Sequence, residues 1–117
     1  MDQLSPEALE AIADQFKVLS SPTRLALLQH ICEGERTVSE LIILTGFKQA
    51  NVSRHLSLLD RAGFVRRRVD AGHVYYELQD PSLPTLCSII RESLVAKQGR
   101  INATLDLTDV AGGLAEA

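Results

Sequence analysis

The residues best suited to chemistry in this sequence lie between positions 46 and 78, and their chemistry is the binding of a polyanion. Six basic side chains stand against the single acid Asp60 in residues 48–68, although the whole chain has a formal net charge of −3. They are Lys48, Arg54, Arg61, Arg66, Arg67 and Arg68. Basic side chains that contact nucleic-acid phosphates release counterions, and this gain does not require a basic protein. The local charge therefore predicts a nucleic-acid contact.

The first half of this segment is predicted to be a helix with one polar face. Val52, Leu56 and Leu59 recur at helical spacing and form an apolar stripe. The candidate DNA contacts around the other side are Lys48, Gln49, Asn51, Ser53, Arg54, His55 and Ser57. Gln and Arg can bond adenine and guanine bidentately. The alternative is a solvated helix face, and His55, at the margin of the stripe, fits packing as well as a DNA contact.

The second half of the segment is predicted to be a β-hairpin. Residues 64–69 and 74–78 are rich in β-branched and aromatic side chains and flank the turn Asp70-Ala71-Gly72-His73. The candidate phosphate or minor-groove contacts on it are Arg66, Arg67, Arg68 and His73. Side chains alternate between the faces of a strand, so the middle arginine points away from its two neighbours and the three cannot share one role. The alternative is a set of solvated strand charges.

Two cysteines, Cys32 and Cys87, are the candidates for thiol chemistry. The start of the chain, MDQLSPEALE, lacks the basic and apolar regions of a secretory signal, so we expect reduced thiols and a cytoplasmic protein. Each cysteine lies on an apolar stripe, and one interpretation is that both are buried as small hydrophobic side chains. Another is that they bind a soft ion such as As(III), Cd(II) or Cu(I), which prefers thiolate.

Start and stop signals divide the chain before this segment into three helices. Ser5-Pro6 and Ser21-Pro22 are pairs typical of an N-cap and first turn, and they predict helices over about 6–19 and from 22 to 33, before Gly34. Thr37 and Glu40 match a capping box at the start of a third helix, which Gly46 ends. The helix predicted over 49–62 follows at once, so the two form a helix-turn-helix pair.

The chain is expected to form one domain with a short tail. Asp80-Pro81 signals the start of a last helix, whose apolar stripe runs to Leu94. We expect residues 1–98 to form a winged-helix domain for DNA binding and dimerisation, and 99–117 to be a loosely held C-terminal tail. With 45% hydrophobic residues the chain can bury a modest core, and no apolar run approaches the roughly 18 residues of a membrane span.

Three stretches carry a family resemblance that spans Gln15 to Leu94. They are LSSPTRLALLQHICEGERTVSEL, QANVSRHLSLLDRAGFVRRR and GHVYYELQDP. With them the chain resembles the ArsR/SmtB family of small bacterial metalloregulatory repressors. The resemblance implies a mainly α fold with a β-hairpin wing, and a homodimer in which the first and last helices pack across a two-fold axis. It also implies a repressor that binds a palindromic operator and is released by an inducer.

The resemblance also directs attention to sensor sites. Where the family has a thiolate metal site on the third helix, this chain has Thr37-Val38-Ser39, which offers no such ligand. At the interfacial zinc positions it has Asp80, Ser82, Ser93 and Ala96, so no metal site is expected there. Some members pair a cysteine of the second helix with one of the last helix and respond to persulfides or oxidants. Cys32 and Cys87 lie on those two helices, displaced along both, which makes a dithiol switch a third interpretation.

Two other classes of function stay open beside the repressor. The sequence has no Gly-rich phosphate loop, no intact metal tetrad and no recognisable Ser/His/Asp set, so an enzyme is not expected. The same fold can serve as a protein-interaction module, although the basic segment favours DNA. The second alternative is a regulator of the same family that senses neither thiol reagents nor metals.

Overall fold

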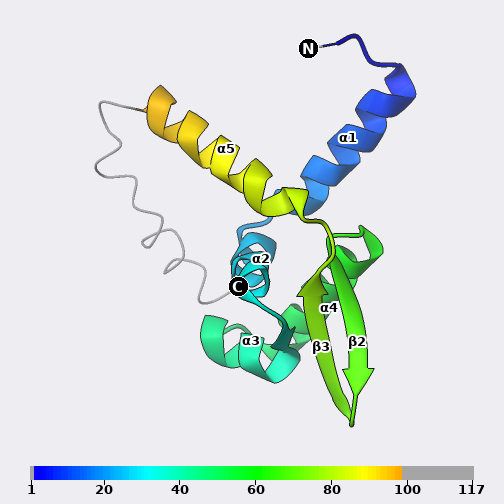
Figure 1. The fold of residues 1–117 in the computed structure, drawn as a ribbon, viewed down its shortest axis with the longest axis vertical. Helices are drawn as coiled ribbons and strands as arrows, with labels where there is room; N and C mark the ends of the chain where they lie inside the picture. Colours follow the sequence, from blue (N-terminus) through cyan, green and yellow to red (C-terminus); the bar gives the residue numbers. More distant parts are fainter. Residues whose placement is uncertain (1, 99–117) are drawn as a thin grey trace.

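The computed structural model describes residues 2–98, and the expected tail at 99–117 lies outside this range. Its elements are α1 (Pro6–Leu19), α2 (Pro22–Glu33), β1 (Arg36–Thr37), α3 (Val38–Thr45), α4 (Gln49–Arg61), β2 (Val65–Asp70), β3 (His73–Leu78) and α5 (Ser82–Lys97). The two longest helices, α1 and α5, come together near the middle of the molecule and diverge toward one end, while α3 and the tip of the β2–β3 hairpin lie at the other end (Figure 1). This layout confirms the winged helix-turn-helix.

The helix boundaries follow the local signals of the sequence. The side chains of Ser5 and Ser21 accept hydrogen bonds from the amides of Ala8 (3.1 Å) and Arg24 (3.3 Å), as N-caps do. At α3 the predicted capping box is present: Thr37 Oγ1 accepts from the Glu40 amide at 3.1 Å, and the Glu40 carboxylate accepts from the Thr37 amide at 3.0 Å. The starts of α1, α2 and α3 are therefore fixed by hydrogen bonds between residues close in the sequence.

The hairpin is confirmed, with a tighter turn than the expected four residues. Asp70 pairs with His73, so only Ala71 and Gly72 form the turn. Both have positive φ, 50° and 80°, the conformation that matches the twist of a two-residue hairpin. A third strand, β1, pairs with β3 through Arg36 and Thr37 and was not expected, because two residues are too few to show alternation.

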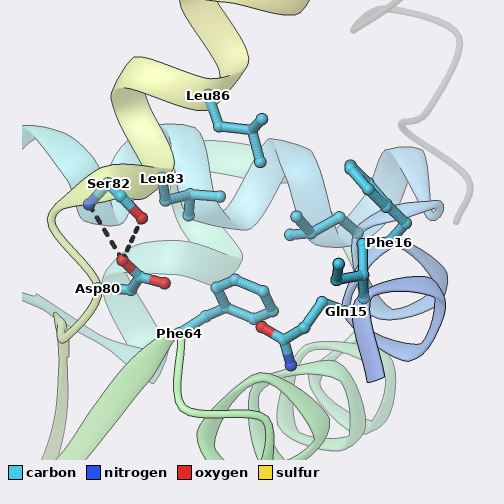
Figure 2. Close-up of a pocket in the computed structure, with 9 residues that line it drawn as sticks. Gln15, Phe16, Phe64, Asp80, Ser82, Leu83 and Leu86 are labelled. Atoms are coloured by element: carbon cyan, nitrogen blue, oxygen red, sulfur yellow. Dashed lines mark hydrogen bonds between the residues drawn. The ribbon is translucent and has the colours of Figure 1, made fainter. Parts of the chain in front are cut away.

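The last helix begins one residue later than the sequence suggested. Asp80-Pro81 was expected to supply the N-cap and first helical residue, but α5 starts at Ser82 and Pro81 is the cap residue. Asp80 still contributes, because its Oδ1 accepts from the amide of Ser82 at 3.0 Å and from its hydroxyl at 2.5 Å (Figure 2). The carboxylate thus satisfies an otherwise open amide at the helix start.

The hydrophobic core lies under the helix-turn-helix and the sheet. Its buried members are Leu27, Leu28, Ile31, Leu41, Phe47, Val52, Leu56, Leu59, Phe64, Val65, Tyr76 and Leu83. None of them comes from α1, and α5 contributes only Leu83. Both outer helices therefore leave apolar side chains exposed: Leu9, Ile12, Phe16, Ile89, Ile90, Leu94 and Val95. None of the helices within residues 2–98 is both long and apolar enough to cross a membrane.

Candidate nucleic-acid interface

Helix α4 turns one face into the core and the other to solvent. Val52, Leu56 and Leu59 are each 0% exposed, so the predicted apolar stripe is the buried side of the helix. The side chains left exposed around α4 include Lys48, Gln49, Ser53, Arg54 and Ser57. Because the stripe is fully packed, α4 cannot rotate without losing core contacts, and its polar face has one fixed direction.

The N-terminal end of α4 is arranged to attract anions. Lys48 is the cap residue and makes no side-chain cap hydrogen bond, because a lysine ammonium has no acceptor for a backbone amide. The first turn of α4 contains no acidic residue, so nothing offsets the positive end of the helix dipole. One turn along, Arg54 Nη2 donates to Asn51 Oδ1 at 3.3 Å, and this contact orients the guanidinium along the exposed face.

His55 has the packed arrangement that was one of its two interpretations. Its ring is half-buried, and Nδ1 accepts a hydrogen bond from Arg24 Nε at 3.2 Å. The partner is thus a side chain of α2. Burial lowers the pKa of His55 below its usual value, and the positive charges of Arg24 and Arg54 lower it further. His55 is therefore neutral near pH 7.

The three consecutive arginines of the wing, the β2–β3 hairpin, differ in their partners. Arg66 forms an ion pair with Glu77, the residue opposite it on β3. Arg68 binds Glu35, and its guanidinium lies 4.5 Å from the centre of the Tyr75 ring. Arg67 is exposed and has no carboxylate partner among residues 2–98. It is thus the wing arginine whose charge is least compensated within the protein.

A cleft brings the recognition helix and the wing together. It has a volume of about 350 Å³ and lies between the start of α3, the first turns of α4 and the hairpin turn. Gln49 and Ser53 line it from α4 and His73 lines it from the wing, so candidates separated by about 20 positions in the sequence share one cleft. His73 is exposed and makes an edge contact with the Tyr75 ring, at 6.4 Å between centroids.

The cysteines are not buried, which corrects the interpretation of them as core side chains. Cys32 and Cys87 are both free and exposed. Cys32 directly follows Ile31, the last core residue of α2, and Cys87 lies one turn after Leu83, the one buried residue of α5, yet neither thiol is buried in the core. Partial desolvation by neighbouring atoms raises the pKa of both thiols, and a Cys87 thiolate raises that of Cys32 further.

Metal ligands are not gathered at any point of the described structure. Within residues 2–98 there is no group of three or more His, Cys, Asp or Glu side chains that could hold a metal ion. Asp80, the one acidic residue left at the family's interfacial zinc positions, is engaged by the amide and hydroxyl of Ser82. The residues present therefore do not fit a four-coordinate zinc site.

The exposed faces of α1 and α5 border a shallow apolar groove. It has a volume of about 200 Å³ and is lined by Ile12, Gln15, Phe16, Leu19, Phe64, Asp80, Ser82, Leu83 and Leu86. In Figure 2, Asp80, Ser82 and Leu83 lie on the left of the groove, Phe16 and Gln15 lie on the right, and Phe64 lies between the two groups. The groove continues the exposed apolar side chains of both helices, so one large unpartnered surface covers this end of the molecule.

Two residues that matter for this geometry were missed in the sequence. Arg24 contacts His55 on α4, and Glu35 contacts Arg68 on the wing. The partners are 31 and 33 positions apart in the chain. No periodicity or capping pattern connects residues so distant, and only the charge complementarity of Glu35 and Arg68 could have suggested a pair.

Comparisons with known proteins agree with this geometry. Residues 21–67 match the model of the bacterial regulatory proteins of the arsR family. A probable mercury resistance operon repressor of Streptomyces lividans is 42% identical over 76 residues, which are 65% of this chain and 61% of that protein. The HTH-type transcriptional regulator Rv0081 of Mycobacterium tuberculosis is 34% identical over 83 residues, which are 70% of this chain and 73% of that protein.

Solved structures share the fold over most of the chain. The crystal structure of Rv0081 has a TM-score of 0.74 at 30% identity and covers 83% of this chain and 97% of its own. A homodimeric winged helix-turn-helix DNA-binding domain from Mycobacterium bovis has a TM-score of 0.68 at 25% identity, and covers 85% of this chain and 93% of its own. On these findings, the chain belongs to the ArsR family of bacterial regulatory proteins.

Proposed function

We propose that this protein is a transcriptional repressor that binds duplex DNA as a homodimer, with α4 of each protomer in the major groove. The observation that carries the proposal is the rigid, exposed polar face of α4, which has a basic N-terminal end and a fully buried reverse side. The relative from Streptomyces lividans is named as a probable repressor, which supports the same role for this protein. The proposed role is DNA binding and not catalysis. A protein with this role would lie in the cytoplasm, with the chromosome.

The proposed contacts divide into base reading and backbone binding. Gln49, Ser53 and Arg54 project from the first turns of α4 and have the hydrogen-bonding groups that distinguish bases in the major groove. The proposed phosphate contacts are Lys48, Asn51 and Ser57 around α4, with Arg67 and His73 on the wing. Arg66 and Arg68 are secondary candidates, because each would have to exchange a carboxylate partner for a phosphate.

The proposed dimer uses α1 and α5. Their exposed apolar side chains form a surface that a second copy of the chain would remove from water. The homodimeric domain from Mycobacterium bovis has the same fold. Isologous packing of these helices would relate the two α4 helices by a two-fold axis. We therefore infer a palindromic operator, with half-sites about 34–36 Å apart, one turn of DNA.

The signal that releases the protein from DNA is proposed to act on the thiols. Cys32 and Cys87 are exposed, one on α2 and the other on α5, and negative charge on Cys87 raises the pKa of Cys32. Two thiols can lose two electrons and two protons to an oxidant and form a disulfide, or bind a soft ion. Either change would alter the placement of α5 relative to α2, and so the dimer.

Fluorescence anisotropy with the duplex upstream of the protein's own gene tests the DNA-binding role. We expect tight binding that weakens steeply with salt, and loss of sequence preference in a variant with both Gln49→Ala and Arg54→Ala. Lys17→Ala, which removes one exposed cation from α1, is the control and should keep the preference. A double variant that binds and discriminates like the wild type would overturn the assignment of α4. Absence of salt-dependent duplex binding by the wild type would favour a protein-interaction module.

A further inference from the structure

One half-buried guanidinium joins three helices. Arg24, on α2, donates from Nη1 to the backbone oxygen of Val18 at 2.8 Å, in the last turn of α1. From Nε it donates to His55 Nδ1 at 3.2 Å, on α4. Its own amide is held by the N-cap Ser21 at 3.3 Å, so the base of the side chain is fixed as well. Arg24 thus spans the distance from α1 to α4 with two directed bonds.

The bridge depends on the planar fork of arginine and on a neutral imidazole. Two donors on one rigid group can reach two acceptors in fixed directions, which a lysine ammonium on a flexible stem does not reproduce. Nδ1 accepts only while it is unprotonated. The charged groups facing His55 are Arg24 from α2 and Arg54 from its own helix, so a protonated ring would add a third cation and lose the bond.

Helix α1 has few other attachments to the rest of the fold. It contains no buried residue, and only Val18 and Leu19 at its end pack against the core. The bond from Arg24 to Val18 therefore lies at the point where α1 joins the body of the molecule. Through Nε the same guanidinium binds His55, which is adjacent in the sequence to the exposed Arg54 and to the buried Leu56. The bridge connects the base of α1 with the middle of α4.

We infer that Arg24 is a positioning residue for DNA reading, which fixes the direction of α4 relative to α1 and does not itself touch DNA. In a homodimer built on α1 and α5, the angle between α1 and α4 sets the separation of the two recognition helices. Arg24 therefore determines which half-site spacing the protein accepts. This inference rests on the proposed DNA-binding function and specifies how the dimer arrangement reaches α4.

The test uses the full chain and a palindromic duplex that the wild-type protein selects from a random library. Arg24→Gln is compared with the wild type on that duplex, on duplexes with one base pair added or removed between the half-sites, and on a scrambled duplex. We expect affinity for the selected duplex to fall by about tenfold, the scale of losing bonds to a charged group. Affinity for the scrambled duplex and the salt slope should be retained, and the preference for one spacing should weaken.

A control and a contrary outcome separate this role from others. Lys17→Gln removes an exposed cation from the same end of α1 and should preserve the spacing preference. If Arg24→Gln lowers the salt slope by about one and reduces affinity for the scrambled duplex as much as for the selected duplex, Arg24 is a phosphate contact and the inference is wrong. An unchanged affinity and spacing preference would also overturn it. Failure of the wild type to select any duplex would instead refute the proposed function.

A second arm does not require a substitution at Arg24, in case that variant fails to fold. His55→Asn places an oxygen where Nδ1 stood, so it retains an acceptor but does not titrate. We expect the affinity of the wild type for its selected duplex to fall from pH 8 to pH 5.5 relative to that of His55→Asn. The other histidines, His30 and His73, are the same in both proteins, so they do not contribute to the difference between the two profiles. Parallel pH profiles for the two proteins would exclude the bridge as a determinant of DNA affinity.

Discussion

The carboxylate of Glu35 holds the guanidinium of Arg68 through two bonds, with Nη2 at 2.6 Å from Oε1 and Nε at 3.2 Å from Oε2. Glu35 lies between α2 and β1, and Arg68 lies in the middle of β2, so the pair ties the wing to the body of the fold. Tyr75 supports the guanidinium from β3. A residue that the sequence suggested for DNA contact is thus engaged in holding the wing in place.

Loss of this pair should loosen the wing. We predict that Glu35→Gln increases amide hydrogen exchange in β2 and β3 relative to the wild type, because a neutral amide cannot replace the charge-assisted pair. Glu10→Gln, on the exposed face of α1, is the matched control and should leave exchange in the wing unchanged. Equal protection of the wing in Glu35→Gln and the wild type would show that the pair does not hold it.

The same pair should make the wing sensitive to acid. The hydrogen bond from Arg68 lowers the pKa of Glu35 below 4.5. The ion pair therefore contributes its full stabilisation above the ordinary pKa of 4.5. This stabilisation is lost as the pH falls through the lowered pKa of Glu35 in the folded protein. We predict that protection of β2 and β3, corrected for intrinsic exchange, decreases in the wild type over that acidic range. Glu35→Gln should lack this step, and a step of equal size in both proteins would assign it to another group.

The wing arginines should contribute unequally to DNA binding. Arg67 is exposed without a carboxylate partner among residues 2–98, whereas Arg66 is paired with Glu77. We predict that Arg67→Ala reduces the slope of log affinity against log salt by about one, the change for one lost phosphate contact. Arg66→Ala, which removes the same charge from the next position, should change the slope less. A larger effect at Arg66 would mean that its ion pair opens on DNA.

Local patterns were sufficient for the helices and the hairpin, and insufficient for the contacts that join them. The capping box of Thr37 and Glu40 is a bond between neighbours in the chain, and it is present as expected. The bonds from Arg24 to His55 and from Arg68 to Glu35 depend on how the finished elements pack. Periodicity also misjudged the cysteines, because an apolar stripe in the sequence does not show how far the core extends around or along a helix.

The exposed faces of α1 and α5 lead to a prediction about assembly. Phe16 and Ile90 are 51% and 48% exposed, and in the proposed homodimer they lie in the interface. We predict that Ile90→Asp raises the dimer dissociation constant by at least about a hundredfold, since an unpaired buried carboxylate costs several kcal/mol. Sedimentation equilibrium measures this dissociation constant. Ile43→Asp, at an 81% exposed apolar position on α3, is the control and should leave the association unchanged.

The thiols give a prediction about reactivity as well as signalling. Desolvation raises the pKa of Cys32 and Cys87 above 9.0, so little thiolate is present at pH 7 in the folded protein. We predict that iodoacetamide modifies both cysteines more slowly in the folded than in the unfolded protein at pH 7.5, and that the folded rate rises as the pH approaches 9. Equal rates in the two states at pH 7.5 would contradict the raised pKa values.

Oxidation should then release the protein from DNA if the pair is the sensor. Oxidised glutathione would take the two electrons and two protons of the thiols, which leaves a Cys32–Cys87 disulfide and two molecules of glutathione. We predict that the protein loses the mass of two hydrogen atoms and, with it, its affinity for the duplex. Neither change is expected in Cys32→Ser or Cys87→Ser. Because bridging requires the two Cα atoms to lie within about 7 Å, the disulfide also demands that α2 and α5 approach closely at these residues. A wild-type protein that stays on DNA while its thiols are oxidised would separate the cysteines from the signal and assign release to another ligand.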